Sequence, residues 1–261
     1  MIIVRLSGAL GNQMFDYAAG RSLALKNHTS LKLDVSFYDL NLVPKRVYSL
    51  GVFKIQENFA SKDELARLKV NEENPIRKYF PRFSAHLGLN QKPSHVREAD
   101  LKTEFLDIPD DTYIDGHWQS EKYFKWVDKI IRQEFSFKKR PTGLNTKLLQ
   151  KITHTASVSI HIRRTDYLTP RSRRTYYLCP KVYYLKAVNF IASRVKNPHF
   201  YVFSDDPAWG RNNLKLKFPT EFITNNSIDC GYEDLRLMTA CKHNIIVNSS
   251  FSWWAAWLNS N

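Results

Sequence analysis

The sequence predicts an α/β fold built on parallel β-sheets that are covered by helices on both faces. Two observations lead to this class. Four short apolar runs in the second half alternate with helix-like segments, and the first residues follow the same strand, helix, strand order. With 43% hydrophobic and 25% charged residues, the composition is typical of a soluble protein with a sizeable core. A length of 261 residues allows one large domain or two of ordinary size.

The first half opens with a short apolar run that predicts a buried strand, followed by a glycine-containing turn. Apolar and small residues then recur on one face, which predicts a helix. Residues 40–100 are irregular, rich in charge, proline and aromatic residues, and carry no motif. The predicted elements are a strand at residues 2–4, a turn at 7–12, a helix that includes Met14 to Leu23, strands at 31–35 and 112–114, and an amphipathic helix at 123–135.

The second half alternates more regularly between strand and helix patterns. It follows the segment KKRPTGLN at residues 138–145, which has the composition of a linker. We therefore predict two domains, residues 1–145 and 146–261. The predicted elements of the second domain are strands at 157–162, 199–203, 221–224 and 244–247 and helices at 181–195, 232–240 and 251–258.

Two arginines, Arg163 and Arg164, directly follow the first strand of the second domain. Ligands of open parallel sheets bind at the carboxyl ends of the strands, and the guanidinium fork matches phosphate oxygens. Neighbours in an extended segment point to opposite sides, so one arginine can face a pocket while the other braces a carboxylate. Asp166 is the only acid between His161 and Lys186. It is either an ion-pair partner or a general base.

Polar residues also end two further strands of this domain. After the second strand, Asp205 and Asp206 precede a proline, a pattern that predicts a helix N-cap or a carboxylate that accepts hydrogen bonds from guanine. After the last strand, Asn248 and Ser250 stand at a helix start, where hydroxyls and backbone N–H groups bind anions, although both residue types are also ordinary caps.

Together these strand ends predict a pocket for a nucleotide diphosphate. Its parts are an arginine fork, an acidic reader of the base and a serine-lined helix start. No Asp-x-Asp stands in the loop setting of a diphosphate held by a metal. We therefore expect arginine, and no metal, to neutralise the leaving group.

Several blocks resemble the bacterial α-1,2-fucosyltransferases of glycosyltransferase family 11, which share features with α-1,6- and protein O-fucosyltransferases. Their order along the chain is that of the family, and they span nearly its whole length. The blocks are LSGALGNQMFDYAAG at 6–20, HIRRTDY at 161–167, YVFSDD at 201–206, YEDLRLMTACKHNIIVNSSFSWWAAWLN at 232–259 and, more weakly, DGHWQSEKYF at 115–124.

The resemblance implies a GT-B-like fold of two Rossmann-like domains whose parallel sheets face a cleft, with GDP-fucose held mainly by the second. It implies inverting transfer of L-fucose to the 2-hydroxyl of a terminal galactose, with no metal or cofactor. A transferase with another donor or linkage is the alternative. The implied residues are Arg163 at the β-phosphate, His161 and Asp205 near guanine, Ser250, Phe251 and Ser252 around the phosphate and ribose, and Asn12 and Gln13 near fucose or acceptor.

Two residues of the first block depart from the family pattern. Ala9 replaces a glycine, and Asp16 replaces a glutamine. The chain also stops at Asn261, where family members commonly continue with another strand. We therefore expect a donor domain shortened at its carboxyl end.

The formal charge of +14 favours an anionic partner, which can be a nucleic acid, a membrane surface or a phosphate-bearing small molecule. No RNA-binding or helix-turn-helix motif is present, so we do not expect nucleic acid. The apolar run at the amino terminus is too short for a signal peptide. Three cysteines without a C-x-x-C pair suit a reducing compartment. We expect a cytoplasmic enzyme, peripheral at the inner face of the membrane, that acts on a galactose-terminated oligosaccharide or lipid-linked glycan.

Overall fold

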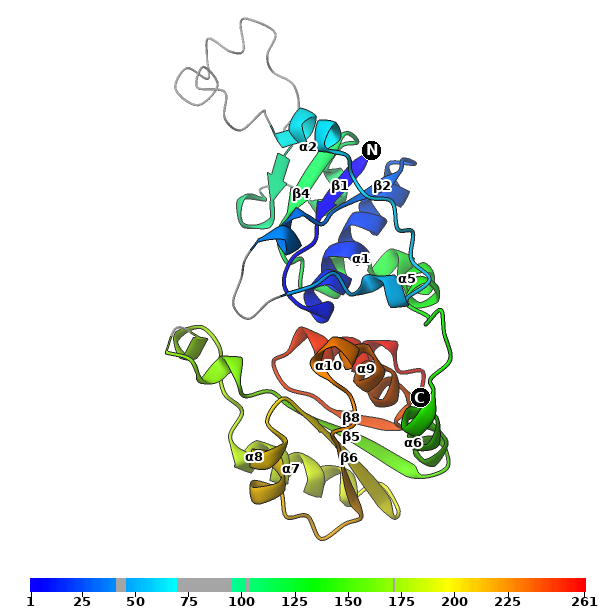
Figure 1. Cartoon of the computed structure of the whole chain (residues 1–261), viewed down its shortest axis with the longest axis vertical. Coiled ribbons are helices and arrows are strands. Elements are labelled where there is room, and N and C mark those ends of the chain that lie inside the picture. Colours follow the sequence, from blue (N-terminus) through cyan, green and yellow to red (C-terminus); the bar gives the residue numbers. More distant parts are fainter. Residues whose placement is uncertain (41–45, 70–94, 102–103, 171) are drawn as a thin grey trace, which may run out of the picture. The chain divides into compact units, whose positions relative to one another are not determined.

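The computed structural model describes residues 1–40, 46–69, 95–101, 104–170 and 172–261 (Figure 1). It divides into two compact units, Met1–Lys138 and Lys139–Asn261. The division lies at the start of the segment 138–145 that the sequence marks as a linker. Among the described residues, each unit contains one four-stranded sheet, and all strand pairs in both sheets are parallel.

The sheet of the first unit has the order β2-β1-β4-β3. The predicted strands at 2–4, 31–35 and 112–114 are confirmed. The short strand β3 falls in the region that was expected to be irregular, of which residues 41–45 and 70–94 lie outside the described part. The strands are β1 (Ile2–Arg5), β2 (Leu31–Asp34), β3 (His95–Arg97) and β4 (Thr112–Asp115).

Helix α1 (Leu10–Lys26) connects β1 to β2 and is buried on all sides. The sequence predicts the helix but not this burial, because its polar Gln13, Asp16 and Ser22 are fully buried as well. The helix lies very close to the sheet at Gly20, where an added Cβ would be 2.8 Å from the side chain of Val4. Only glycine permits this approach.

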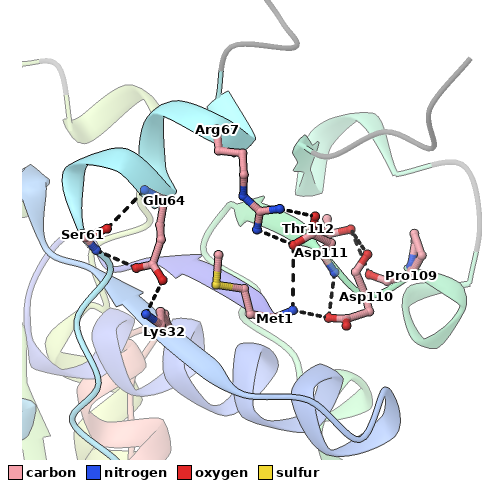
Figure 2. Close-up of polar contacts among 9 residues, drawn as sticks. All are labelled: Met1, Lys32, Ser61, Glu64, Arg67, Pro109, Asp110, Asp111 and Thr112. Carbon is pink, nitrogen blue, oxygen red and sulfur yellow. Dashed lines mark hydrogen bonds and ion pairs between the residues drawn. The ribbon is translucent and has the colours of Figure 1, made fainter. Parts of the chain in front are cut away.

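Helix α2 (Lys62–Lys69), which was not predicted from the sequence, is held to the sheet by polar contacts (Figure 2). Ser61 and Glu64 form a reciprocal cap: the backbone N–H of Glu64 donates to Ser61 Oγ at 3.2 Å, and that of Ser61 donates to Glu64 Oε2 at 2.8 Å. Glu64 also pairs with Lys32 of β2. Arg67 donates to both carboxylate oxygens of Asp111, at 2.8 and 2.6 Å, next to β4.

The helix predicted at 123–135 is correct only for its second part, α5 (Asp128–Glu134). The first part consists of 3₁₀ turns, because the backbone of Phe124 is not helical (φ −140°, ψ 7°). In this conformation the Phe124 ring is fully buried and lies beside Phe15, with the ring centroids 6.2 Å apart. The 3₁₀ helices of this unit span Ser36–Asp39, Leu50–Val52, Glu98–Asp100, Phe105–Asp107, Glu121–Tyr123 and Lys125–Val127.

The sheet of the second unit has the order β7-β6-β5-β8. All four predicted strands and all three predicted helices are confirmed. The linker prediction is wrong at its end, because a helix starts at Gly143. The strands are β5 (Ala156–Ile162), β6 (Pro198–Ser204), β7 (Thr220–Ile223) and β8 (His243–Ile245). The helices are α6 (Gly143–Thr153), α7 (Lys181–Ala192), α8 (Pro207–Asn213), α9 (Gly231–Ala240) and α10 (Ser250–Leu258), with 3₁₀ turns at Asp166–Leu168, Ser172–Arg174 and Ile228–Cys230.

Strand β5 runs through the centre of the second unit and is buried along nearly its whole length. Apolar residues of β5, β6 and α7 form its main core cluster. Polar Ser159 is buried too, and its hydroxyl accepts a hydrogen bond from Asn244 Nδ2 of β8 at 2.7 Å. Because β5 is a central strand, the loop that follows it lies in the middle of the carboxyl edge of the sheet. Within the described residues, no helix has the length and apolar character needed to cross a membrane.

Candidate functional site

The loop that follows β5 places Arg163 among carboxylates. Its Nη2 lies 2.6 Å from Asp166 Oδ2, and its Nε lies 3.4 Å from Asp205 Oδ2. Burial opposes the charge of Arg163, but the hydrogen bond to Asp166 and the charges of Asp205 and Asp166 outweigh it, so the guanidinium pKa lies above its usual value. Arg163 is therefore a permanent, oriented cation that is still about a quarter exposed (27%).

Asp205, at the end of β6, fixes the backbone of this same loop. Its Oδ1 accepts from the backbone N–H of Arg164 at 2.9 Å. Its Oδ2 accepts from the backbone N–H and hydroxyl of Thr165, at 3.1 and 2.7 Å. The resemblance assigned Asp205 to guanine, and nothing in the sequence pointed to this bracing contact, which joins two loops at adjacent strand ends.

Arg164 points to a different set of partners, as the alternation of an extended segment predicts. Its Nε lies 3.3 Å from Asp206 Oδ2, and its guanidinium carbon lies 4.1 Å from the ring centroid of Trp209. Asp206 is at the same time the N-cap of α8, because Asp206 Oδ1 accepts from the Trp209 backbone N–H at 3.0 Å. The N-cap interpretation of this pair of aspartates is thus confirmed for Asp206.

His161 is the penultimate residue of β5, and its side chain is almost completely buried. Burial, with a smaller contribution from the charge of Arg163, lowers its pKa to about 3. The ring is therefore neutral at physiological pH. It lies beside the Phe251 ring, with centroids 5.4 Å apart. The planes of the two rings are tilted by 39°, and both rings are uncharged at physiological pH.

The loop between β8 and α10 supplies the serine-rich helix start. Ser250 is the first residue of α10, so the positive end of the helix dipole lies at this loop. Ser252 differs from the prediction, because it is fully buried and its hydroxyl contacts the turn itself, 3.2 Å from the carbonyl oxygen of Ser249. The structure therefore gives Ser252 a place in the framework of the loop rather than on its surface.

Tyr167 joins the loop after β5 to the loop after β8. Its hydroxyl donates to the backbone carbonyl of Asn248 at 2.8 Å, and its ring stacks on Tyr176, with centroids 4.7 Å apart and planes 8° from parallel. Asn248 in turn donates from Nδ2 to the carbonyl of Tyr177 at 2.8 Å. No role for Tyr167 was predicted from the sequence, although the tyrosine ends the HIRRTDY block.

In the first unit, Asn12 and Gln13 lie in the first turn of α1 and differ in their environment. Asn12 Oδ1 accepts from Gln119 Nε2 at 3.0 Å in an exposed pair. Gln13 is fully buried, donates to the carbonyl of Val47 at 2.8 Å and accepts from the Ser49 backbone N–H at 2.8 Å. The prediction that Gln13 faces fucose or acceptor does not fit this structure, because both ends of its amide hold the chain together.

The two departures from the family pattern have simple local explanations. Ala9 has an extended backbone (φ −94°, ψ 176°), which any residue adopts, whereas the left-handed position is Gly8 (φ 68°). Asp16 is fully buried and accepts from the Ser7 backbone N–H at 3.0 Å. Burial raises the pKa of Asp16 well above its usual value, against the effect of the Ser7 hydrogen bond. The turn before α1 is therefore held by a hydrogen bond to the carboxyl group of Asp16, where the family pattern has the amide of a glutamine.

Neither disulfide nor metal chemistry has an evident centre in the part of the chain that the structure describes. Cys179, Cys230 and Cys241 are all free thiols. Among the described residues, no three His, Cys, Asp or Glu side chains are grouped so that they could hold a metal ion.

Comparison with known proteins identifies the family. The model of "Glycosyl transferase family 11" matches residues 1–261. The chain belongs to this family. It is 33% identical over 273 residues to an α-1,2-colitosyltransferase of Escherichia coli, covering 100% of this chain and 88% of the relative. It is 32% identical over 277 residues to the O-antigen biosynthesis glycosyltransferase WbnK of Escherichia coli, covering 98% and 89%. It is 26% identical over 272 residues to the galactoside 2-α-L-fucosyltransferase Sec1 of Mus musculus, covering 99% and 64%.

Solved structures of fucosyltransferases share the fold of this family 11 member. NodZ α-1,6-fucosyltransferase superposes with a TM-score of 0.57 at 13% identity, covering 98% of this chain and 91% of that chain. Arabidopsis thaliana FUT1 gives a TM-score of 0.51 at 12% identity, covering 99% and 68%. At these identities the likeness concerns the fold alone. The predicted GT-B-like α/β class with parallel sheets is confirmed.

Proposed function

We propose that this family 11 glycosyltransferase transfers L-fucose from GDP-fucose to the 2-hydroxyl of a terminal galactose, with inversion and without a metal. The observation that carries the donor half of the proposal is the oriented cation Arg163, which stands at the carboxyl edge of the sheet in the same unit as the amino terminus of α10. A guanidinium and the backbone N–H groups of a helix start donate hydrogen bonds to phosphate oxygens and stabilise charge on a leaving diphosphate. A phosphate-bearing donor therefore accounts for the basic edge better than a nucleic acid does.

The neutral pair of His161 and Phe251 supports a contact with guanine, because uncharged aromatic rings suit a base. We propose that Asp205 serves this base as well as bracing the loop, since each carboxylate oxygen can accept more than one hydrogen bond. Asn248 and Ser250 then lie near the phosphates and ribose through their place at the start of α10.

Asp166 had two possible roles, as base or as orienting residue. Its contact of 2.6 Å with Arg163 supports the orienting role, because a carboxylate in an ion pair is already engaged with a cation. We propose that Asp166 holds the guanidinium toward the diphosphate. The acceptor proton then goes to another group.

One of the relatives supports a second candidate for the sugar nucleotide donor. A relative at 33% identity is named a colitosyltransferase, and colitose is fucose without its 3-hydroxyl. We therefore propose GDP-colitose as the alternative donor, with the same α-1,2 linkage. For the acceptor we propose a galactose-terminated oligosaccharide or lipid-linked glycan, reached at the inner face of an anionic membrane to which the net charge of +14 is attracted.

The test is transfer by the purified chain with GDP-fucose and GDP-colitose in parallel, on a panel of β-galactosides. Product linkage is determined by NMR, and Arg163→Ala serves as the inactive control. We expect an α-1,2 product with one of the two donors. Binding of GDP without transfer from either donor to any galactoside would refute the proposed acceptor and linkage. Absence of GDP binding would refute the donor site.

A further inference from the structure

The segment between Asp166 and Asp205 of the second unit carries positive charge without a single acidic residue. Helix α7 lies in the middle of this segment. An anionic partner that meets α7 therefore meets no carboxylate from the segment itself, and the excess of cations attracts it. The seven cationic residues of the segment are Arg171, Arg173, Arg174, Lys181, Lys186, Arg194 and Lys196.

One face of α7 is fixed in the core of the second unit. Tyr184 and Val188 are almost completely buried and belong to the same core cluster as apolar residues of β5 and β6. Their spacing of four residues places them on one side of the helix. The burial of this side determines which α7 side chains face solvent.

The opposite side of α7 presents apolar and basic residues in alternation. Val182 (53%) and Phe190 (56%) are exposed, and so are Lys186 and Arg194. These four residues recur at every fourth position along the helix and into the turn that follows it, which gives a single stripe. Tyr183 lies beside the stripe and is exposed as well. We call these five residues the α7 face.

Two residues of the α7 face are held together at its carboxyl end. The guanidinium carbon of Arg194 lies 3.7 Å from the ring centroid of Phe190, and Arg194 Nη1 donates to the Phe190 carbonyl oxygen at 3.1 Å. At the other end, the Tyr183 hydroxyl donates to the backbone carbonyl of Ile246. The aromatic rings and the cation therefore have defined positions on the surface before a partner arrives.

We propose that the α7 face docks onto an anionic lipid bilayer. Val182 and Phe190 enter the interfacial region, and Lys186 and Arg194 reach the phosphate groups of the lipids. Helices that lie in a membrane interface combine such apolar and basic side chains, and anionic lipids attract each cation near the surface. The inference extends the membrane contact of the proposed function, and vesicle binding tests it without sugar transfer.

Nucleic acid fits the α7 face less well than a bilayer does. Bases of single strands stack on open aromatic faces, and Arg194 already covers one face of the Phe190 ring. Val182 has no π face to offer a base. In a bilayer interface, by contrast, the aliphatic side chain and the ring both lose contact with water, which is favourable.

Helix α6 provides a matched control on the other side of the sheet. The connections β5–β6 and β6–β7 cross the sheet in one direction, and β7–β8 crosses it in the opposite direction. Right-handed crossovers therefore place α7 and α8 on one face and α9 on the other, and α6 packs against α9 (Figure 1). Lys147 and Lys151 of α6 are exposed and share the spacing of Lys186 and Phe190.

The test is cosedimentation of the full chain with vesicles of phosphatidylglycerol and phosphatidylcholine, with vesicles of phosphatidylcholine alone for comparison. We expect wild type to bind the anionic vesicles. Lys186→Ala/Arg194→Ala should bind about 25-fold more weakly at low salt, from about fivefold for each cation, and this difference should shrink in high salt. Phe190→Ser should bind about tenfold more weakly at both salt concentrations, because salt does not screen the insertion of an apolar ring.

The control variant Lys147→Ala/Lys151→Ala lowers the net charge by the same amount and should bind like wild type, because its lysines lie beyond the Debye length of about 10 Å from the bilayer. Circular dichroism verifies that each variant is folded. An equal loss in both double variants would overturn the inference, because overall charge would then explain the binding. Absence of wild-type binding to the anionic vesicles would overturn it too.

Two further outcomes separate the inference from its alternatives. Binding of single-stranded DNA that the α7 double variant loses, without binding to vesicles, would assign the α7 face to nucleic acid and overturn the inference. Transfer to a soluble galactoside should be the same in wild type and in the α7 variants. A chain that binds vesicles through the α7 face but transfers no sugar would refute the proposed function and leave this inference standing.

Discussion

Arg163 and Asp166 form an ion pair within a single loop turn, with 2.6 Å between Nη2 and Oδ2. Asp205 approaches the other side of the same guanidinium, 3.4 Å from Nε. The cation is therefore oriented by two carboxylates from different strand ends before any ligand arrives. Such preorganisation makes a charged group effective at a leaving diphosphate, because little reorganisation is needed during the reaction.

Replacement of Arg163 should nearly abolish transfer and leave the fold intact. Loss of a charge-assisted contact to the leaving group costs about 2–4 kcal/mol of transition-state stabilisation. Arg163→Lys should also be poor, because the planar fork is lost. Steady-state kinetics and circular dichroism measure the two effects. Near-normal turnover of the lysine variant would contradict a bidentate phosphate contact.

Arg164→Ala is the matched comparison, because Arg164 has the same chemistry but contacts Asp206 and Trp209. We expect a loss of about 1–2 kcal/mol in the free energy of unfolding, from the cation–π contact and the partly buried ion pair. Chemical denaturation measures it. An unchanged stability together with a complete loss of GDP binding would assign the phosphate to Arg164.

Asp166→Asn distinguishes orientation from base catalysis. An orienting residue should lose GDP affinity together with rate, because the asparagine no longer holds the guanidinium. A base should lose rate by about 10²–10⁴-fold at constant GDP affinity. We expect the first result, from GDP calorimetry and kcat measured on the same preparation. Full activity of the variant would exclude both roles.

Transfer should continue in excess EDTA. In the proposed mechanism Arg163 and the amino terminus of α10 neutralise the charge that a divalent ion would otherwise neutralise. Initial rates with EDTA, and with manganese added back, provide the measurement. Complete loss in chelator that manganese restores would contradict the proposal.

Buried His161 should make the protein less stable in mild acid. Its pKa of about 3 in the folded chain lies below the usual 6.5, so the unfolded chain binds the proton more tightly. The contribution of His161 to the free energy of unfolding should therefore be constant above about pH 6.5 and fall by about 1.4 kcal/mol per pH unit below it, toward the folded pKa. Denaturation of wild type and His161→Asn at about pH 7 and about pH 5 tests this. Equal slopes in both proteins would contradict it.

The parallel strands were predictable because they are short apolar runs between turn residues, as at Val158 to Ile162. Helix α6 was missed because its start, Gly143, has a left-handed backbone (φ 55°) inside a segment of linker composition. The 3₁₀ turns before α5 were missed because the apolar spacing there also fits an α-helix. In that segment the burial of Phe124 decides the backbone, and burial is a tertiary property.

The sequence predicted which strand ends carry the candidate site residues, but not which of their side chains face outward. The rule that ligands meet the carboxyl edge brought Arg163, Asp205 and Ser250 into one hypothesis. Which of them faces outward depends on hydrogen bonds between distant residues, such as Asp205 with the Thr165 backbone. The burial of Gln13 depends on such contacts as well.

The bridge from Tyr167 to Asn248 ends on a backbone carbonyl, and so does the return contact from Asn248 to Tyr177. Every residue type offers a carbonyl at that place. Substitutions at the accepting positions therefore leave the acceptor atoms in place, and no compensating change is demanded of the donor. Pairwise covariation among homologous sequences would not detect the coupling between these two loops. Hydrogen exchange would register it, because the two loops should gain or lose protection together.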